Sequence, residues 1–397
     1  MTRSVFNARW FSPLAVLAIG VMALAGACTP APSAARPRAT ASFVDGAEEA
    51  IDDNGLSLAV ADFNRDGVQD LAVGHPMMVR VLSAVNGAWS TLARGDAPVD
   101  SYMEIQAMDV DRDGRVDLLV PGEGLTVLRQ AADGGFLLDR AIATSSGDAG
   151  TYGVTAFEVA DVDGDGRKDV VVANQTVSGP EVRFLAGLDG QPWVGRPELV
   201  GPVPSSPSDL VVASMDADGR PDVAVSQYLA GVTLFASRTS GPFGPGLVVV
   251  PPGLTPDRVA AGDVDGDGRQ ELVVSSRYGT PVVLRHAIDG GFDAPVPLPV
   301  NGCGVVRVAD LDLDGLAEIV LGCARGAGVS TPTSSSIVVL RQGGWPSFVE
   351  VQRLETDNYL VNLEVVDLTG DGRLDLAATF LATPVTKVRL WSGVGPD

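Results

Sequence analysis

The strongest constraint on this chain is a nine-residue pattern that occurs seven times. In the copy Asp161-Val-Asp-Gly-Asp-Gly-Arg-Lys-Asp169, carboxylates stand at positions 1, 3, 5 and 9. The first residues of successive copies are 47, 52, 53, 49, 47 and 57 positions apart, a spacing typical of a repeat with about four short strands. The copies span Asp62–Asp70, Asp109–Asp117, Asp161–Asp169, Ser214–Asp222, Asp263–Glu271, Asp310–Glu318 and Asp367–Asp375.

The segments beside each copy have the pattern of strands. A short run rich in β-branched residues precedes the loop, as in Val305–Ala309, and another follows it, as in Asp169–Val172. Each loop therefore joins two strands of a hairpin. A third run follows, and after a Gly-rich turn an aromatic residue starts a fourth. These aromatic residues are Trp89, Phe136, Trp193, Phe243, Phe292 and Trp345. Seven repeats of four strands predict an all-β fold, a seven-bladed β-propeller over residues 41–397.

The two ends of the repeat array complement each other. The last repeat stops after its third run, Lys387–Trp391, whereas the N-terminal segment Ala41–Val44 supplies an extra run that contains Phe43. We predict that residues 41–46 complete the last blade and close the ring, because an open ring would leave two sheet edges unpaired. The alternative is that Phe43 belongs to a frayed terminus.

The pattern resembles a known family. The D-x-D-x-D-G-x-x-D-L-x-V repeats are similar to the FG-GAP/VCBS repeats of integrin-α-type propellers, and Val73-Gly-His-Pro76 resembles the Gly-Ala-Pro half of the FG-GAP name. The resemblance covers residues 41–397 and supports the propeller fold. It implies less about function, because such propellers serve as adhesion modules, lectins and scaffolds for some lyases.

The loops have the composition of calcium sites. Calcium takes six to eight oxygen ligands, which the side chains at positions 1, 3, 5 and 9 and the backbone carbonyl at position 7 can supply. Position 6 is glycine in every copy, where the chain must turn sharply. We expect up to seven sites, with Ser214–Asp222 the weakest. The alternative is a set of Asp-rich turns satisfied by backbone amides alone. The expected ligands are Asp62, Asn64, Asp66, Val68, Asp70, Asp109, Asp111, Asp113, Arg115, Asp117, Asp161, Asp163, Asp165, Arg167, Asp169, Asp216, Asp218, Arg220, Asp222, Asp263, Asp265, Asp267, Arg269, Glu271, Asp310, Asp312, Asp314, Leu316, Glu318, Asp367, Thr369, Asp371, Arg373 and Asp375.

These loops also explain the charge of the chain. The formal net charge is −22, and the four side-chain ligand positions hold 25 of the 50 acidic residues. Half of the acidic residues are therefore expected calcium ligands, and the negative charge does not indicate a basic partner. A charge of this sign excludes nucleic acid and anionic membrane surfaces as expected partners.

The N-terminus has the features of an export signal. Residues 1–27 combine Arg3 and Arg9 with an apolar run, which predicts a signal peptide. Leu24-Ala-Gly-Ala-Cys28 resembles a bacterial lipobox, which implies lipidation of Cys28 ahead of a Pro/Ala linker over residues 28–40. We expect an exported lipoprotein of the cell envelope, on the outer membrane, that meets the membrane only through its lipid. The alternative is ordinary cleavage and a periplasmic or secreted protein.

Two further cysteines flank the sixth loop. Cys303 and Cys323 lie on strands expected to run antiparallel, which places their thiols near each other. In an exported protein this pattern favours a disulfide. The alternative is two buried free thiols.

No catalytic constellation is visible in the sequence, so we expect a protein without enzymatic activity. The strand directions place a polar and aromatic set on the face opposite the calcium loops, a composition typical of recognition surfaces. That set comprises Tyr102, Tyr152, Asn174, Tyr228, Arg277, Tyr278 and Tyr359. The alternative is that tyrosines simply favour strand ends.

The expected function is a monomeric propeller that binds a protein or glycan through this face. One alternative is a polysaccharide lyase or hydrolase, which an acid pair of raised pKa near the central axis would favour. Another is a structural subunit of a surface complex, which a large exposed apolar patch would support.

Overall fold

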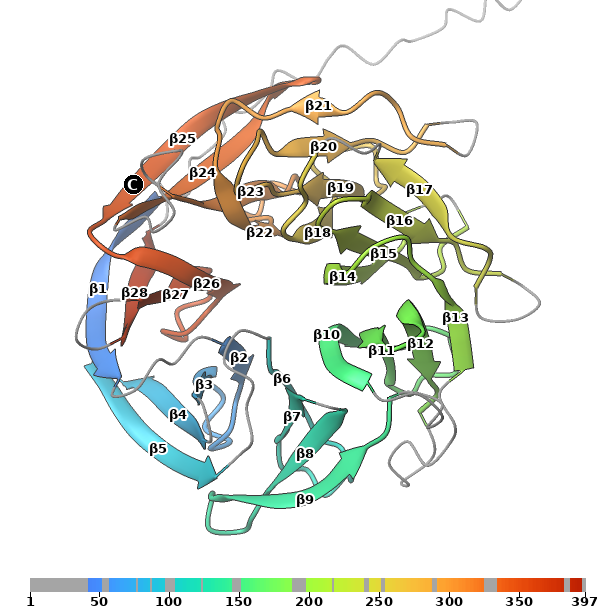
Figure 1. Ribbon diagram of the computed structural model, residues 1–397. Coiled ribbons are helices and arrows are strands. Elements are labelled where there is room, and N and C mark those ends of the chain that lie inside the picture. Colours follow the sequence, from blue (N-terminus) through green and yellow to red (C-terminus); the bar gives the residue numbers. More distant parts are fainter. Residues whose placement is uncertain are drawn as a thin grey trace, which may run out of the picture. The chain divides into compact units, whose positions relative to one another are not determined.

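The computed structural model describes residues 42–51, 57–75, 78–85, 88–96, 104–122, 124–144, 151–187, 198–215, 218–238, 243–250, 254–287, 291–324, 334–381 and 386–394. These residues form 28 strands and no helix. The strands make seven antiparallel sheets of four strands each, arranged as the blades of a ring (Figure 1). This arrangement confirms the predicted seven-bladed propeller. Within the described ranges we find no helix with the length and apolarity that a membrane crossing requires.

The first four blades follow the first four loops in chain order. Blade 1 contains β2 (Ser57–Ala61), β3 (Asp70–His75), β4 (Met78–Val85) and β5 (Ala88–Asp96). Blade 2 contains β6 (Gln106–Met108), β7 (Asp117–Pro121), β8 (Leu125–Gln130) and β9 (Phe136–Ile142). Blade 3 contains β10 (Thr151–Ala160), β11 (Asp169–Thr176), β12 (Gly179–Leu185) and β13 (Glu198–Pro202). Blade 4 contains β14 (Pro207–Ala213), β15 (Asp222–Gln227), β16 (Gly231–Phe235) and β17 (Leu247–Val250).

The remaining three blades include the one that closes the ring. Blade 5 contains β18 (Val259–Gly262), β19 (Glu271–Val274), β20 (Val282–Leu284) and β21 (Val296–Pro297). Blade 6 contains β22 (Cys303–Ala309), β23 (Glu318–Ala324), β24 (Ser335–Gly344) and β25 (Ser347–Thr356). Blade 7 contains β26 (Tyr359–Val366), β27 (Asp375–Leu381), β28 (Thr386–Val394) and β1 (Ser42–Ile51).

Hydrophobic packing occurs between blades. Both faces of the second strand in a blade are apolar, as in Asp117–Pro121, where all five residues are buried. One cluster joins Val79 and Val81 of blade 1 to Leu118 and Leu128 of blade 2, and each of the other clusters likewise joins consecutive blades. A blade therefore buries its apolar surface only when both neighbours are present.

The N-terminal strand closes the ring, as predicted. β1 pairs antiparallel with β28 from Ser42 opposite Val394 to Ile51 opposite Thr386. The Phe43 side chain is buried at 4% exposure, and the side-chain amide of Gln352 donates to the Phe43 carbonyl and accepts from its backbone N–H, both at 2.8 Å. Phe43 thus occupies the seventh aromatic position.

This closing strand is longer than the predicted 41–46. The extension is held by ion pairs of Glu48 with Lys387 at 2.6 Å and of Glu49 with Arg80 at 3.1 Å, and it ends in the fully buried Ile51. A bulge interrupts the register after Asp45. At Gly46 in this bulge, a Cβ would lie 2.9 Å from the Leu390 carbonyl oxygen, so the close backbone approach requires glycine.

The aromatic residues of the fourth strands lie at the outer edge of the blades. Phe136 stacks edge-on against Phe63 at 5.9 Å between ring centroids, and Phe243 meets Phe184 at 6.3 Å. Trp193 lies outside the described residues. Where the fourth strand is proline-rich, as in the two-residue β21, the ladder is short, because proline cannot donate a hydrogen bond.

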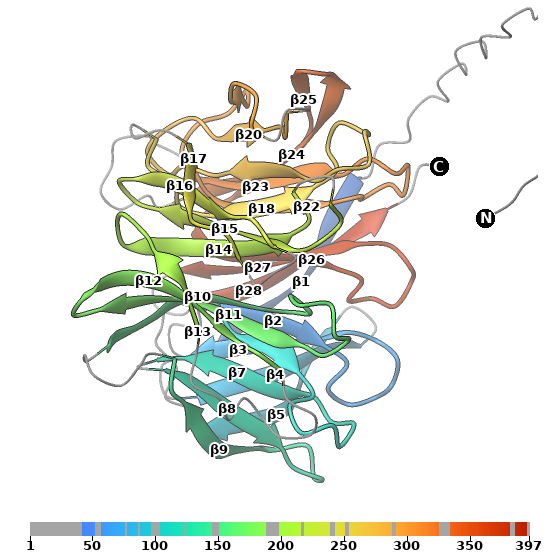
Figure 2. The same ribbon diagram turned by 90° about the vertical axis from the view of Figure 1, so that its right-hand side faces the viewer.

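The strands run from one face of the ring to the other, as the side view in Figure 2 shows. Each first strand enters a nine-residue loop, so all seven loops lie on one face, which we call the loop face. Neighbouring loops there touch, since the Ala317 amide donates to the Asp263 carbonyl at 2.9 Å. The turns between second and third strands lie on the opposite face, which we call the turn face.

Candidate metal centres and axial cavity

The nine-residue loops are organised around their first carboxylate. In the second loop, Asp109 accepts the backbone N–H of Asp113 at 3.1 Å and that of Gly114 at 2.8 Å. Gly114 has φ +83°, a left-handed conformation that favours glycine. The same N–H to carboxylate contact recurs at position 6 of the other fully described loops, for example Gly268 to Asp263 at 2.9 Å.

The acid at position 9 is the most buried residue of each loop. Asp117 is fully buried and accepts the Val110 N–H at 3.0 Å and the Gln130 N–H at 2.8 Å. It therefore ties the loop to the third strand of its blade. Equivalent pairs of bonds are made by Asp169, Asp222 and Asp375. Burial raises the pKa of Asp117 above the usual range of a carboxyl.

Four loops bring three acidic side chains together. In each, one carboxylate oxygen per residue lies within 4.8 Å of the others. The sets are Asp109, Asp111 and Asp117; Asp161, Asp163 and Asp169; Asp263, Asp265 and Glu271; and Asp310, Asp312 and Glu318. These are positions 1, 3 and 9 of the predicted ligand pattern.

Position 5 lies outside these sets. In loops 2, 3 and 5 its carboxylate pairs with the arginine side chain at position 7, as in Asp267 with Arg269 at 2.7 Å and in the close contact of Asp165 with Arg167. It also accepts the position 7 backbone N–H, as in Arg115 to Asp113 at 2.8 Å. The structure thus gathers three of the four predicted carboxylates. The fourth is held by the neighbouring arginine in these three loops, whereas loop 6 has Leu316 at position 7.

The other three loops gather fewer acids, as their sequences predict. Loop 1 has Asn64, whose amide donates to Asp66 at 2.9 Å, and loop 7 has Thr369. Loop 4 begins with Ser214, and its Asp216 lies outside the described residues. Among the residues that the structure describes, none of these loops forms a three-acid set.

The donor set fits a calcium ion. The sites offer only hard oxygen ligands, which calcium prefers. Burial, followed by the charges of the neighbouring aspartates, raises the pKa of Glu271 and of Glu318 to about 7. The Glu271 Oε1 atom is buried and accepts no hydrogen bond within the described part of the chain. A cation held by positions 1, 3 and 9 would neutralise this repulsion and satisfy that oxygen.

A cavity of about 450 Å³ lies on the axis of the ring. Residues from the first strands of all seven blades line it, and Figure 1 shows these strands, β2, β6, β10, β14, β18, β22 and β26, around the centre. The charged residues that line it are Glu104, Glu158, Asp209, Arg307 and Glu364. A smaller adjoining cavity of about 20 Å³ is lined by Glu104, Asp209 and Arg258 among others.

One part of this axial group is a network of paired charges. Arg307 pairs with Glu364 at 2.8 Å and makes a close ion pair with Glu104. Arg258 pairs with the other oxygen of Glu104 at 3.3 Å. Although burial opposes ionisation, the two arginines hold the pKa of Glu104 below its usual value.

The other part consists of Glu158 and Asp209, for which the described residues provide no ion pair. Glu158 accepts the Val212 N–H at 2.8 Å, and Asp209 accepts the Val259 N–H at 3.0 Å. Burial raises the pKa of Glu158 to about 8 and that of Asp209 to about 6. These are the two acids of raised pKa near the axis that the enzyme alternative requires.

None of the predicted site residues belongs to this axial group, although the sequence carries a signal for it. Glu158, Arg307 and Glu364 stand three residues before the first residue of their loops, and Glu104, Asp209 and Arg258 stand five before theirs. These two positions point to the same side of a strand. At the same two positions, blade 1 has the uncharged residues Ala59 and Ser57. The axial charges are therefore not a feature that every repeat shares.

The residues predicted for the turn face have diverse surroundings. Tyr278 is 70% exposed and Tyr228 is 44% exposed. Arg277 is exposed and pairs with Asp257 at 3.3 Å, and Tyr359 is half-buried. Tyr102 and the side chain of Tyr152 lie outside the described residues.

Asn174 is the exception among these candidates. It is fully buried in β11. Its side-chain amide donates to the Thr144 carbonyl at 2.8 Å, and its side-chain oxygen accepts from the Thr144 hydroxyl at 3.0 Å. Its polar groups are therefore used within the protein, and Asn174 adds nothing to an exposed surface.

Among the described residues near the turn face, large exposed side chains lie on blades 3, 4 and 5 and, at Leu381, on blade 7. Apart from Tyr228 and Tyr278 in blades 4 and 5, Leu229 is 65% exposed in blade 4, and Val177 is 63% exposed in the corresponding turn of blade 3. Large exposed apolar and aromatic side chains at neighbouring turns are typical of interaction surfaces. We call these four residues with Arg277 the turn-face patch.

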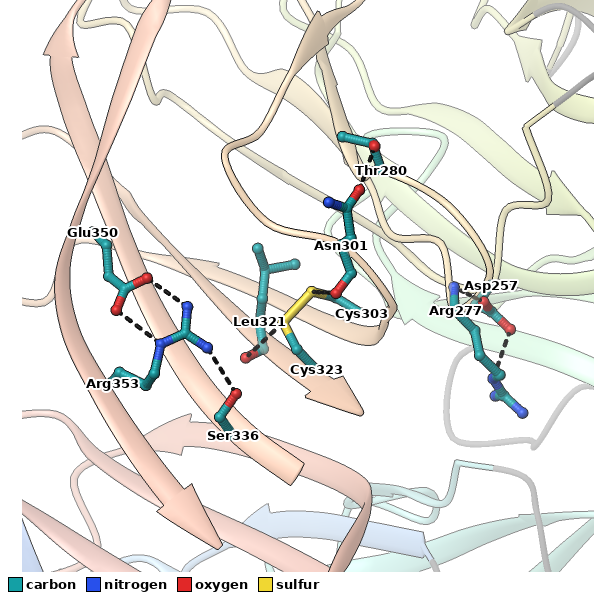
Figure 3. The surroundings of a disulfide bond; sticks show 10 residues. All are labelled: Asp257, Arg277, Thr280, Asn301, Cys303, Leu321, Cys323, Ser336, Glu350 and Arg353. Carbon is teal, nitrogen blue, oxygen red and sulfur yellow. Dashed lines mark hydrogen bonds and ion pairs between the residues drawn. A yellow bond between two sulfur atoms is a disulfide. The ribbon is translucent and has the colours of Figure 1, made fainter. Parts of the chain in front are cut away.

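A disulfide joins Cys303 and Cys323 in blade 6 (Figure 3). The two residues lie directly opposite each other on β22 and β23, and the S–S distance is 2.06 Å. The bond links the ends of these strands near the turn face, with the Asp257–Arg277 pair in the same surroundings (Figure 3). Cys28 lies outside the described residues.

Comparison with known proteins agrees with this architecture. The model of the FG-GAP-like repeat matches residues 109–172, 215–274 and 263–321, and that of the FG-GAP repeat matches residues 54–80. No curated protein matches the sequence significantly.

Solved structures show the same fold at low sequence identity. One is BBS1N in complex with ARL6DN, soaked with lead, at 12% identity and TM-score 0.59, covering 88% of this chain and 96% of that one. Another is the BP39L lectin from Burkholderia pseudomallei, at 14% identity and TM-score 0.59, covering 87% of this chain and 99% of that one. With its FG-GAP matches and seven four-stranded blades, the chain is an FG-GAP-repeat β-propeller protein.

Proposed function

We propose that the protein is a non-enzymatic, calcium-stabilised propeller of the cell envelope that binds a protein or glycan through the face opposite its calcium loops. The single observation that carries this proposal is the turn-face patch. Aromatic and aliphatic side chains there are exposed on three successive blades, beside the guanidinium of Arg277. Tyrosine and arginine are enriched where proteins bind their ligands.

The loop face supports the proposal from the other side of the ring. Its carboxylates are directed inward to backbone amides and to the three-acid sets, so they act on the loops themselves. Cation binding would fix the hairpins and leave the turn face for recognition. Lipidation at Cys28 and the linker over residues 28–40 would tether the ring to the envelope while leaving that face accessible.

Both kinds of ligand occur among proteins of this fold. One similar structure is a lectin, and another is a complex with a second protein. At 12–14% identity the likeness concerns the fold alone, so the choice between protein and glycan rests on experiment.

The test is a double variant, Tyr228→Ala with Tyr278→Ala, in the secreted form of the protein. A glycan array and a pull-down from envelope extracts first identify the ligand for the wild-type chain. We expect the double variant to lose at least about 2 kcal/mol of binding free energy while its melting temperature is unchanged. The control is Leu313→Asn, an equally exposed apolar residue on the loop face. Unaltered capture by the double variant would place recognition elsewhere.

One observation favours the alternative of a polysaccharide lyase or hydrolase, namely the raised pKa of Glu158 and Asp209 at the axis. A carboxyl that stays protonated near neutral pH can serve as a general acid. Incubation with envelope polysaccharides, with the release of reducing or unsaturated ends as the readout, decides this point. Activity that disappears in Glu158→Gln would establish that the protein is a polysaccharide lyase or hydrolase.

A further inference from the structure

The axial cavity contains charges that the propeller fold does not require. At the positions three and five residues before the loops, blade 1 has Ala59 and Ser57, which shows that small side chains satisfy the inner strand. Placing carboxylates and guanidinium groups there costs desolvation energy. Six such groups around one axis therefore indicate a binding function.

The paired half of this group is balanced. Arg258 and Arg307 face Glu104 and Glu364, two positive charges against two negative. Asn362 adds a longer contact to Arg307 at 3.4 Å. The charges of these four residues are balanced within the protein and need no ligand.

The unpaired half is not balanced. Glu158 on β10 and Asp209 on β14 each use one carboxylate oxygen to accept a backbone N–H. Asp209 is 7% exposed. Arg258 and Arg307 lower its pKa through their charge and Arg307 also lowers that of Glu158, but in the described chain neither arginine makes an ion pair with Glu158 or Asp209. Each carboxylate keeps a second oxygen that can accept a hydrogen bond from a donor in the cavity.

The rest of the lining disfavours a metal ion. A divalent cation of the calcium type needs six or more oxygens. The nearest neutral candidate, Gln106, is already occupied, since its amide donates to the Phe157 carbonyl at 2.8 Å and its oxygen accepts the Val159 N–H at 3.1 Å. Aliphatic residues such as Val211 and Ala260 make up much of the wall, which suits a carbon skeleton.

We propose that the axial cavity binds a small organic cation, whose ammonium group is held by Glu158 and Asp209 while its carbon skeleton packs on the aliphatic wall. A volume of about 450 Å³ is within the range of sites for small metabolites. An ammonium group donates up to three hydrogen bonds, and the second carboxylate oxygens of Glu158 and Asp209 can accept two of them. An amino sugar and a free amino acid amide both carry this chemistry.

The position of Glu158 in the cavity also affects whether its carboxyl group is protonated. In the free protein Glu158 holds its proton near neutral pH, with Asp209 and Glu104 as the nearby negative charges and Arg307 as an opposing positive one. An entering ammonium group stabilises both carboxylates in their charged form. Binding at pH 7 therefore releases a proton from the protein.

The experiment is titration calorimetry of the full-length chain in saturating Ca²⁺ at pH 7, with butylamine as the first probe. Its neutral counterpart, butan-1-ol, has the same carbon skeleton without the charge. We expect butylamine to bind at one site per chain and butan-1-ol to bind at least about tenfold more weakly. Titrations in two buffers of different ionisation enthalpy measure the released proton. Glucosamine and lysine amide then show whether a sugar or a peptide skeleton is preferred.

The variants are Glu158→Gln and Asp209→Asn, with Glu198→Gln as the matched control for an exposed carboxylate on β13. The first two are expected to weaken butylamine at least about tenfold, and Glu158→Gln to abolish proton release, while the control changes neither. Equal affinity for the alcohol, or unchanged binding in both variants, would overturn the proposal. If a variant fails to melt cooperatively, the amine–alcohol comparison and the proton release of the wild type decide alone. The turn-face patch takes no part in this test, so either proposal can fail without the other.

Discussion

The loop face and the axis both concentrate charge, but they do so in opposite ways. In the loops, carboxylates recur at the same positions in blade after blade and contact groups within nine residues or in the same blade. On the axis, charged residues break the repeat and pair across the ring, as Arg307 does with Glu104, 203 residues away. Residues that every repeat shares, such as the loop carboxylates, stabilise the blade. Residues that depart from the repeat, such as the axial charges, are better candidates for the specific function of this chain.

The two regions also differ in what balances their charge. The loop acids gather in sets of three with oxygens within 4.8 Å, an arrangement that could hold a cation from solution. The axial network carries its own arginines. Removing calcium should therefore affect the loops first, and removing an arginine should affect the axis.

Calcium removal is expected to have the largest effect. Each site occupied at about 100 times its dissociation constant stabilises the folded state by about 2.7 kcal/mol. For the four three-acid sets together, chelation should lower the melting temperature by at least about 10 °C. The measurement is a thermal melt followed by circular dichroism, with and without chelator.

The control adds Mg²⁺ in place of Ca²⁺, because magnesium keeps its water ligands more strongly. Magnesium should restore little of the lost stability. A melt that is the same in chelator and in calcium would show that backbone amides alone satisfy these turns. The loop acids would then need no cation, and this difference between the loop face and the axis would not exist.

Replacing Arg307 by Met is expected to have the next largest effect. It leaves Glu104 and Glu364, whose side chains are only 24% and 20% exposed, without their main partner. Breaking a fully buried pair costs about 3–5 kcal/mol, and we expect about half of that for this partly exposed network. Denaturant unfolding in saturating calcium measures the loss of free energy of unfolding.

The matched control is Arg353→Met. Arg353 pairs with Glu350 on the surface, with both side chains more than a third exposed, and such pairs contribute at most about 1 kcal/mol. Equal losses for the two variants would mean that the axis is as well hydrated as the surface. In that case the axial charges need no functional explanation.

The same contrast explains what the sequence could predict. The seven blades and the closing strand followed from repetition, because each loop is flanked by the same strand pattern and Phe43 matches the other aromatic residues. The three-acid sets also followed, since positions 1, 3 and 9 belong to one short segment. Local patterns report local structure.

What the sequence could not predict depends on the closed ring. Glu104 meets Arg307 and Arg258 only because blades 2, 5 and 6 face one axis. The burial of Asn174 depends on Thr144, a residue 30 positions earlier. The position 5 acids were expected to join the ligands, yet the arginine two residues on competes for them, and spacing alone does not rank these partners.

The smallest predicted effect concerns pH and isolates Glu158. Its pKa is about 8 in the folded state, against about 4.3 in an unfolded chain. The folded protein therefore holds a proton that the unfolded chain has released, and this contribution to stability declines as the pH rises from about 4.5 to about 8. Asp209, with a folded pKa of about 6, acts in the same direction within that window.

Glu158→Gln keeps an acceptor for the Val212 N–H but cannot ionise. We expect the wild type to lose about 1–3 kcal/mol of unfolding free energy relative to this variant between pH 5 and pH 8.5, with calcium saturating so that the loop acids stay charged. Glu198→Gln, which alters an exposed carboxylate, should track the wild type throughout. A difference between wild type and Glu158→Gln that does not change with pH would mean that Glu158 is ionised in the folded state and already has a partner. The unpaired half of the axial group would then no longer call for a cationic ligand.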